Sequence, residues 1–291
     1  MWIIRLISHL PLRVLYFGAD VLFVLLYYVF RYRFKIVNKN LVRCFPDKKD
    51  DEIKKIRKKF FRSLSDYVAE IFKAVTMSER LVSKSIKFSN PEILQEKYAG
   101  KTVIVLTGHV FNWEWYGMAI SHAFKTKGGS AFIYQKISNT LIDKMMLKAR
   151  GRFGAKPFLR EQTARAVVGA RDRATLFFIL ADQTPFGKVK RYWTNFMGYP
   201  TAFYLGIDQV VKMTKVPVVY CSVKREGRGK FEVTFKEIEN TENDFQVLKG
   251  YISLLEEDIK KNPSEWLWTH RRWKLKMKEH DVFDNDINIE K

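Results

Sequence analysis

A histidine and a glutamate with four residues between them form the most chemically suggestive pattern in this chain of 291 residues. They are His109 and Glu114, in the segment GHVFNWEW. A carboxylate bonded to one ring nitrogen of an imidazole fixes its tautomer and leaves the other nitrogen as a base. Such a pair can take a proton from a substrate hydroxyl. Because this spacing is common by chance, the alternative is a histidine at a strand end and a glutamate on a solvated helical turn.

Motifs that mark several other enzyme classes are absent from the sequence. It contains no G-x-S-x-G, G-x-x-x-x-G-K-[ST], G-x-G-x-x-G or H-E-x-x-H, which disfavours hydrolase, NTPase, dinucleotide-binding and metalloprotease functions. The cysteines, Cys44 and Cys221, have no metal-ligand spacing. We therefore expect neither a structural zinc site nor a disulfide framework, and we predict no metal site.

The elements next to the pair indicate where it lies. Thr102–Thr107 is a short run rich in β-branched residues and predicts a buried strand, and a helix is predicted from 112 to 124. Open α/β sheets place ligand sites beyond the carboxyl ends of strands, where His109 would then lie. If the helix begins near Phe111, Glu114 could fold back towards the imidazole.

Strands and helices alternate along the rest of the chain. Further strands are predicted at 131–134, 175–180, 216–223 and 231–235, and helices at 50–75, 137–149, 161–171, 201–214 and 244–261. This alternation predicts an α/β fold in which helices flank a central mixed sheet. One catalytic domain would span residues 36–280, followed by a flexible acidic tail at 281–291.

The N-terminal segment Leu10–Phe30 is apolar except for Arg13 and Asp20. A spanning helix needs roughly 20 such residues, although Asp20 near its middle would cost a few kcal/mol in a bilayer. We interpret residues 1–35 as a membrane anchor, either a single span or an in-plane amphipathic helix; a buried core helix is the alternative. Arg31 and Arg33 follow the segment, so the positive-inside rule predicts a cytoplasmic catalytic domain.

The net charge of +21 indicates anionic partners. Nucleic acid, phosphorylated substrates, acidic proteins and an anionic membrane surface all meet this requirement. No nucleic-acid recognition motif is present, and the apolar N-terminus argues against a nucleic-acid partner.

Several ordered segments, together with GHVFNWEW, resemble one known family along nearly the whole chain. They are the N-terminal apolar segment, LVRCFPD at 41–47, ARGRFGAKPF at 149–158, Ala181–Gln183, 196–201 and WLWTHRRWK at 266–274. This order resembles the lipid A biosynthesis late acyltransferases of the lysophospholipid acyltransferase superfamily. Trp273 stands where that family usually has Phe, and both are aromatic.

The resemblance implies an acyltransferase of lipopolysaccharide synthesis on the cytoplasmic face of a bacterial inner membrane. It would move a fatty acyl chain from acyl carrier protein to a hydroxyl of a lipid A precursor. His109 would be the general base, oriented by Glu114, with no acyl-enzyme and no cofactor. A related acyltransferase with an aminolipid or lysophospholipid acceptor is the alternative, and a catalytically inactive membrane scaffold is another.

Other residues are expected to bind substrate. Arg152 matches a family position and would support a substrate phosphate or the developing oxyanion. Asp182 matches a family position by its placement alone, and a carboxylate in a turn at the end of a strand is the alternative. Asn112 could donate a hydrogen bond near the site or simply cap the helix. Three basic residues could steer the acidic carrier protein and the phosphorylated lipid, or be ordinary surface charge: Lys188, Lys190 and Arg191.

Overall fold

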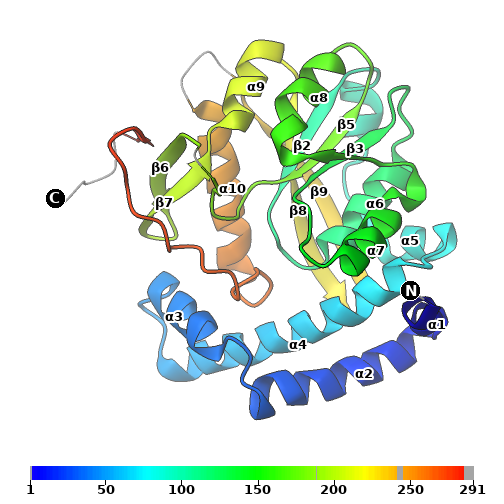
Figure 1. Cartoon of the computed structure of the whole chain (residues 1–291), viewed down its shortest axis with the longest axis vertical. Coiled ribbons are helices and arrows are strands. Elements are labelled where there is room, and N and C mark those ends of the chain that lie inside the picture. Colours follow the sequence, from blue (N-terminus) through cyan, green and yellow to red (C-terminus); the bar gives the residue numbers. More distant parts are fainter. Residues whose placement is uncertain (1, 188, 241–244, 285–291) are drawn as a thin grey trace.

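A computed structural model describes residues 2–187, 189–240 and 245–284. Its centre is a seven-stranded sheet in the order β1-β9-β8-β2-β5-β3-β4 (Figure 1). The strands are β1 (Ile86–Phe88), β2 (Val103–Thr107), β3 (Ser130–Tyr134), β4 (Lys156–Leu159), β5 (Leu176–Leu180), β8 (Val218–Gly227) and β9 (Lys230–Ile238). Neighbouring strands run parallel except for β8 and β9. The predicted α/β fold with a central mixed sheet is confirmed.

The two central strands, β2 and β5, position the site. All five residues of β2 are buried, as expected for a parallel strand covered on both faces. The register pairs Thr107 at the end of β2 with Leu180 at the end of β5. His109 and Asp182 each follow two residues later. The topology therefore brings these two residues, far apart in sequence, to the same edge of the sheet.

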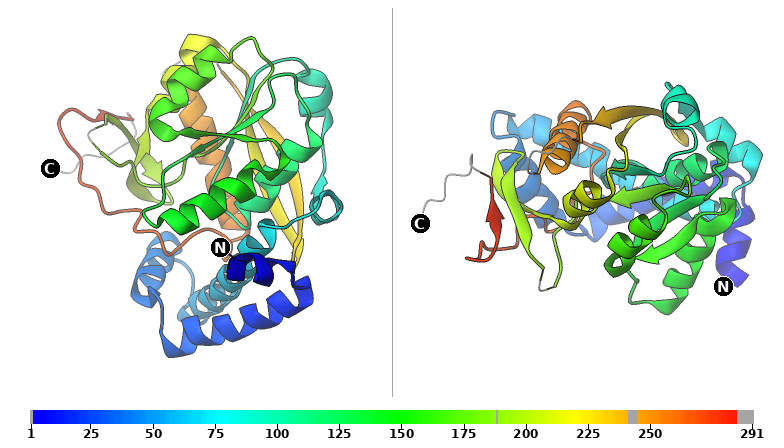
Figure 2. Two further views of the ribbon diagram at one scale, coloured as in Figure 1. Left: turned by 45° about the vertical axis from the view of Figure 1, so that its right-hand side comes forward. Right: turned by 90° about the horizontal axis from the view of Figure 1, so that it is seen from above.

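Helices cover both faces of the sheet (Figure 2). From α4 onwards the helices are α4 (Asp50–Ala74), α5 (Glu79–Ser85), α6 (Trp113–Ala123), α7 (Thr140–Arg150), α8 (Thr163–Gly169), α9 (Gly206–Thr214) and α10 (Gln246–Lys261). Helix α10 packs against β2, β8 and β9, whereas α6 contacts α4, α5 and α7. The start of α4 at Asp50 agrees with the acidic residues in its first turn, which favour the positive end of the helix dipole.

A second, three-stranded sheet corrects two predictions. It contains β6 (Arg191–Phe196), β7 (Tyr199–Tyr204) and β10 (Val282–Phe283). The helix predicted over 201–214 was wrong at its start, because residues 201–204 pair with β6 across a tight turn at Met197 and Gly198. The predicted flexible tail was wrong for 281–284, because β10 pairs with β6 and Asp281 accepts a hydrogen bond from Trp193. Residues 285–291 lie outside the described residues.

The N-terminal segment folds as α1 (Trp2–His9), α2 (Leu12–Val24) with a π-helical turn η1 (Leu25–Val29), and then α3 (Phe34–Cys44). Pro11 interrupts the helix between α1 and α2, as expected for a residue without a backbone N–H. Helix α2 lies along α4 (Figure 1). Of the described helices, only the one at Leu12–Val29 is long and apolar enough to cross a membrane.

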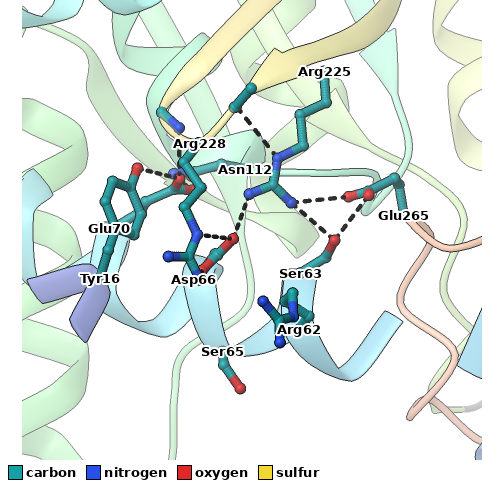
Figure 3. A network of polar contacts seen from close by, with 12 residues as sticks. Tyr16, Arg62, Ser63, Ser65, Asp66, Glu70, Asn112, Arg225, Arg228 and Glu265 are labelled. Atoms are coloured by element: carbon teal, nitrogen blue, oxygen red, sulfur yellow. Dashed lines mark hydrogen bonds and ion pairs between the residues drawn. The ribbon is translucent and has the colours of Figure 1, made fainter. Parts of the chain in front are cut away.

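A buried polar network fastens α2, α4, α6 and the β8–β9 hairpin together (Figure 3). Glu70 of α4 accepts hydrogen bonds from the Tyr16 hydroxyl and from the Asn112 amide, each at 2.8 Å. Arg225 of β8 bonds to Asp66 and lies 3.7 Å from the carboxylate of Glu265. Buried carboxylates need such partners, because an unpaired charge is costly away from water. The network therefore holds the amino end of α6 against α4.

We predict that Glu265→Gln changes how stability depends on pH. Burial raises the pKa of Glu265 from its ordinary value near 4.5 to about 7. The folded protein thus holds this proton more tightly than the unfolded chain does. The resulting stabilisation is complete below pH 4.5 and is lost as the pH rises towards 7, by an amount on the order of a few kcal/mol.

Urea unfolding at pH 5 and pH 7.5 checks this prediction. The Glu265→Gln variant should lose less stability than the wild-type protein between the two values. Glu257→Gln is the control, because hydrogen bonds to Lys261 and Lys236 lower the pKa of Glu257 to about 2, outside this interval. Equal pH dependence in wild type and Glu265→Gln would contradict the prediction.

Candidate active site

A cavity of about 900 Å³ opens at the carboxyl ends of the central strands. Most of its wall is apolar and comes from β3, β5, α6 and α7. Its polar lining includes His109, Glu114, Arg150, Gln183 and Lys190. A large apolar cavity with a few convergent polar groups is the usual form of a ligand site.

His109 is held by Asp182. The two side chains meet with 2.5 Å between imidazole Nδ1 and carboxylate Oδ1. The backbone N–H of His109 donates to Oδ2 at 2.9 Å, and the indole N–H of Trp266 donates to the same oxygen at 2.7 Å. On the other side of the ring, the Gln183 amide nitrogen lies 3.0 Å from Nε2. A neutral imidazole therefore carries its proton on Nδ1, and its Nε2 lone pair can accept a proton.

Asp182 is ionised although only 2% of its surface is exposed. Burial alone would raise the pKa of this carboxyl group. The positive charge that His109 can carry, the hydrogen bonds from His109 and the bond from Trp266 outweigh burial and lower the pKa to about 2. A charged acceptor next to Nδ1 orients the ring and fixes its tautomer.

The backbone around His109 is tightly constrained. A Cβ atom at Gly108 would lie 2.6 Å from Leu255 Cδ1, so only glycine fits there without displacing a neighbour. Phe111 has a φ of +52°, a conformation that costs energy in a non-glycine residue. Its N–H donates to the carbonyl of Glu265 at 2.9 Å, and the N–H of Leu267 donates to the carbonyl of His109 at 3.1 Å. The segment 265–267 thus fixes the histidine loop.

The predicted contact between Glu114 and His109 was wrong. Glu114 lies in the first turn of α6 and forms a bidentate ion pair with Arg150 of α7, with distances of 2.7 and 2.6 Å. It also accepts a hydrogen bond from the Trp113 indole at 3.0 Å. The Trp113 ring stands edge-on to the imidazole, with 4.8 Å between centroids. Glu114 therefore lines the same cavity as His109 without orienting it.

Two further predicted residues have structural contacts. Asn112 caps α6, since its side-chain oxygen accepts from the N–H of Trp115 at 3.1 Å, and this agrees with the capping alternative. Arg152 does not line the cavity: its guanidinium donates to the backbone carbonyls of Val75 and Met77 just after α4. Of the two arginines in this segment, Arg150 lines the cavity.

The three basic residues predicted to steer substrates do not lie together in one place. Lys190 lines the cavity. Arg191 is buried in β6 with its guanidinium 3.8 Å from Asp281, so it does not form part of an exposed steering surface. Lys188 lies outside the described residues. Within the part of the chain that the structure describes, His, Cys, Asp and Glu side chains form no cluster that could hold a metal ion.

Sequence reasoning missed Gln183, Arg150 and Trp266 as site residues. Gln183 directly follows Asp182, and the strand predicted at 175–180 already placed both at a strand end. Arg150 follows Met146 by one helical turn, and both line the cavity. Arg150 comes directly after the predicted helix 137–149, so the continuation of that helix by one residue was the available signal for it.

Comparison with known proteins agrees with this arrangement. A family model described as bacterial lipid A biosynthesis acyltransferase matches residues 1–275, which include the whole cavity. A comparison with curated proteins finds no match. Because the family model covers nearly the full length, the chain belongs to the bacterial lipid A biosynthesis acyltransferases.

Proposed function

We propose that this acyltransferase moves a fatty acyl chain from acyl carrier protein to a hydroxyl of a lipid A precursor, with His109 as general base. The observation that carries the proposal is an imidazole whose Nδ1 is fixed by Asp182 and whose Nε2 contacts Gln183, where both His109 and Gln183 line a large apolar cavity. The family match supports the reaction class. The donor and the acceptor are our proposal.

The proposed chemistry is a direct transfer. The acceptor hydroxyl replaces the Gln183 amide as the partner of His109 Nε2. Nε2 then takes the proton of this hydroxyl. The alkoxide oxygen bonds to the thioester carbonyl carbon, the carbon–sulfur bond breaks, and the leaving thiolate takes the proton from the imidazolium. Asp182 stabilises the imidazolium while it exists.

A covalent acyl-enzyme is not needed for this reaction. Cys44 and Cys221 are buried and do not line the cavity. Burial raises the pKa of the Cys44 thiol to about 12 and places that of Cys221 well above its ordinary value. Neither thiol has the lowered pKa of a reactive cysteine, which supports direct attack by the acceptor.

The ion pair of Arg150 and Glu114 has a separate role in the proposal. Glu114 engages Nε and Nη2 of Arg150, which leaves Nη1 on the third corner of the guanidinium. We propose that Arg150 binds the developing oxyanion or a phosphate of the acceptor, and that Glu114 is a positioning residue acting through it. In place of the predicted dyad of His109 and Glu114, the cavity has two groups that each pair with a carboxylate: His109 with Asp182, and Arg150 with Glu114.

The remaining parts of the proposal concern partners and place. The apolar wall suits an acyl chain, since each buried methylene contributes about 0.8 kcal/mol. The net charge of +21 suits an acidic carrier protein, a phosphorylated lipid and an anionic membrane. We place the reaction at the cytoplasmic face of the bacterial inner membrane. A related acceptor, an aminolipid or a lysophospholipid, is the second candidate.

The test combines the purified protein with acyl carrier protein thioester and a lipid A precursor. We expect mass spectrometry of the lipid to show the gain of one acyl chain. His109→Ala should lower the rate by about 10²–10⁴-fold, the usual contribution of a general base. His280→Ala should have no effect, because that ring is exposed and outside the cavity.

Several outcomes would contradict the proposal. Full activity of a folded His109→Ala protein would show that His109 is not the general base. Acylation of a lysophospholipid or aminolipid but not of the lipid A precursor would move the acceptor to the second candidate. Melting temperatures of both variants, compared with that of the wild-type protein, separate loss of chemistry from loss of fold.

A double-mutant cycle tests whether Glu114 acts through Arg150. Removing either side chain leaves its partner as an unpaired buried charge. We therefore expect Glu114→Ala and Arg150→Ala each to lower kcat/KM strongly, and the double variant to be little worse than either, a coupling of about 2 kcal/mol or more. Glu114→Ala combined with Asp182→Asn should be nearly additive. Additivity of Glu114→Ala with Arg150→Ala would contradict the assignment.

A further inference from the structure

The first two helices present an apolar face to the outside. It consists of Trp2, Leu6, Val14, Phe17, Val21 and Tyr28, and we call it the N-terminal apolar face. In α2 and η1 its members are three, four and seven residues apart, so they share one side of the helix. Phe17 is 71% exposed, and only 22% of the window Leu12–Val29 is buried. An exposed apolar stripe of this length marks a surface that contacts another molecule or a membrane.

The opposite side of α2 is bound to the catalytic domain by polar contacts. Tyr16 donates to Glu70 at 2.8 Å (Figure 3). Asp20 forms an ion pair with Arg228 of the β8–β9 hairpin, whose Nη1 donates to it at 3.0 Å. The hydrogen bond from Arg228 lowers the pKa of Asp20. The one acidic residue of the segment thus points to the domain, away from the N-terminal apolar face.

Both ends of the apolar segment are fastened to that same domain. Before α2, the carbonyl of Ser8 accepts hydrogen bonds from Thr76 at 2.7 Å and from Lys73 at 3.1 Å. After η1, Arg33 donates to the carbonyl of Thr269 at 3.0 Å. A spanning helix of 18 residues would rise about 27 Å and place its two ends on opposite sides of a membrane. The observed contacts require both ends on one side.

We propose that α1 and α2 lie in the plane of the membrane, with the N-terminal apolar face inserted into an anionic bilayer, and that they do not cross it. The charge around this face is complementary to such a surface, because Arg5, Arg13, Arg31, Lys58 and Arg62 are all exposed. Basic residues near an anionic bilayer contribute about 1 kcal/mol each. An in-plane amphipathic helix with this composition is a known membrane-binding device.

The same placement brings the cavity close to the lipid. Ile4 of α1 packs with Val75, Met145 and Met146, and both methionines line the cavity. One layer of side chains therefore separates α1 from the space in which we propose the reaction. This consequence depends on the proposed function, whereas the in-plane topology does not.

Labelling of single cysteines tests the topology. His9→Cys and Lys35→Cys place a thiol at exposed positions before and after the apolar segment. Native Cys44 and Cys221 are buried. In sealed membrane vesicles containing the full-length protein, we expect a membrane-impermeant maleimide to label both variants from the same side. Labelling from opposite sides would overturn the proposal.

Flotation with vesicles tests the face itself. The full-length protein should float with vesicles of phosphatidylcholine and phosphatidylglycerol. The double variant Phe17→Asp/Val21→Asp should lower the vesicle-bound fraction of the protein at least about tenfold. Two apolar side chains are lost from the membrane interface, and the anionic lipid repels the two added carboxylates. Met213→Asp is the matched control, because Met213 is 63% exposed on α9 at the far end of the molecule (Figure 1).

Wild-type flotation of the Phe17→Asp/Val21→Asp variant, or equal loss with Met213→Asp, would overturn the proposal. Melting temperatures verify that the variants fold. His109→Ala should float like the wild-type protein, so a failure of the proposed reaction and a failure of the proposed topology are distinguishable.

Discussion

The buried carboxylate of Asp182 is the interaction on which the site depends. It accepts hydrogen bonds from the His109 backbone, from the His109 ring and from Trp266, and so joins three segments that are distant in sequence. Such a charge would be costly without these partners, because burial removes it from water. The in-register pairing of β2 and β5 brings the two His109 donors to this carboxylate, and the segment 265–267 adds the Trp266 donor. The same buried carboxylate thus holds these segments together and fixes the tautomer of the imidazole.

A second polar layer supports this centre from behind. Glu70 binds the helix cap Asn112 on one side and Tyr16 on the other, so the start of α6 and the membrane-facing α2 share one buried carboxylate. Arg225 extends the layer to Glu265, whose carbonyl holds the strained Phe111. Buried hydrogen bonds and ion pairs of this kind rigidify a structure. The position of the site and the attachment of the N-terminal helices are therefore linked through shared side chains.

The sequence predicted five strands of the central sheet, β2, β3, β5, β8 and β9, but neither its edge strands β1 and β4 nor the second sheet, and it did not predict which residues meet across the strands. The apolar runs of β2 and β5 and the position of His109 at a strand end were readable from local pattern. The orienting carboxylate was not, because Asp182 is 73 residues from His109, and the order of strands does not follow from their alternation. Glu114 was preferred because it is near in sequence, yet its helix turn directs it to Arg150. The choice between spanning and in-plane anchors likewise needed tertiary contacts, such as that of Asp20 with Arg228.

The most direct test of the central claim is the tautomer of His109, measured by ¹⁵N NMR with the signal assigned from a His109→Gln sample. In the neutral ring, we predict a protonated Nδ1 and an unprotonated Nε2. Asp182→Asn should change the ratio of the two neutral tautomers, and Glu114→Gln should leave this ratio unaltered. A ring protonated on Nε2 in the wild-type protein, or one that responds to Glu114→Gln but not to Asp182→Asn, would contradict the account.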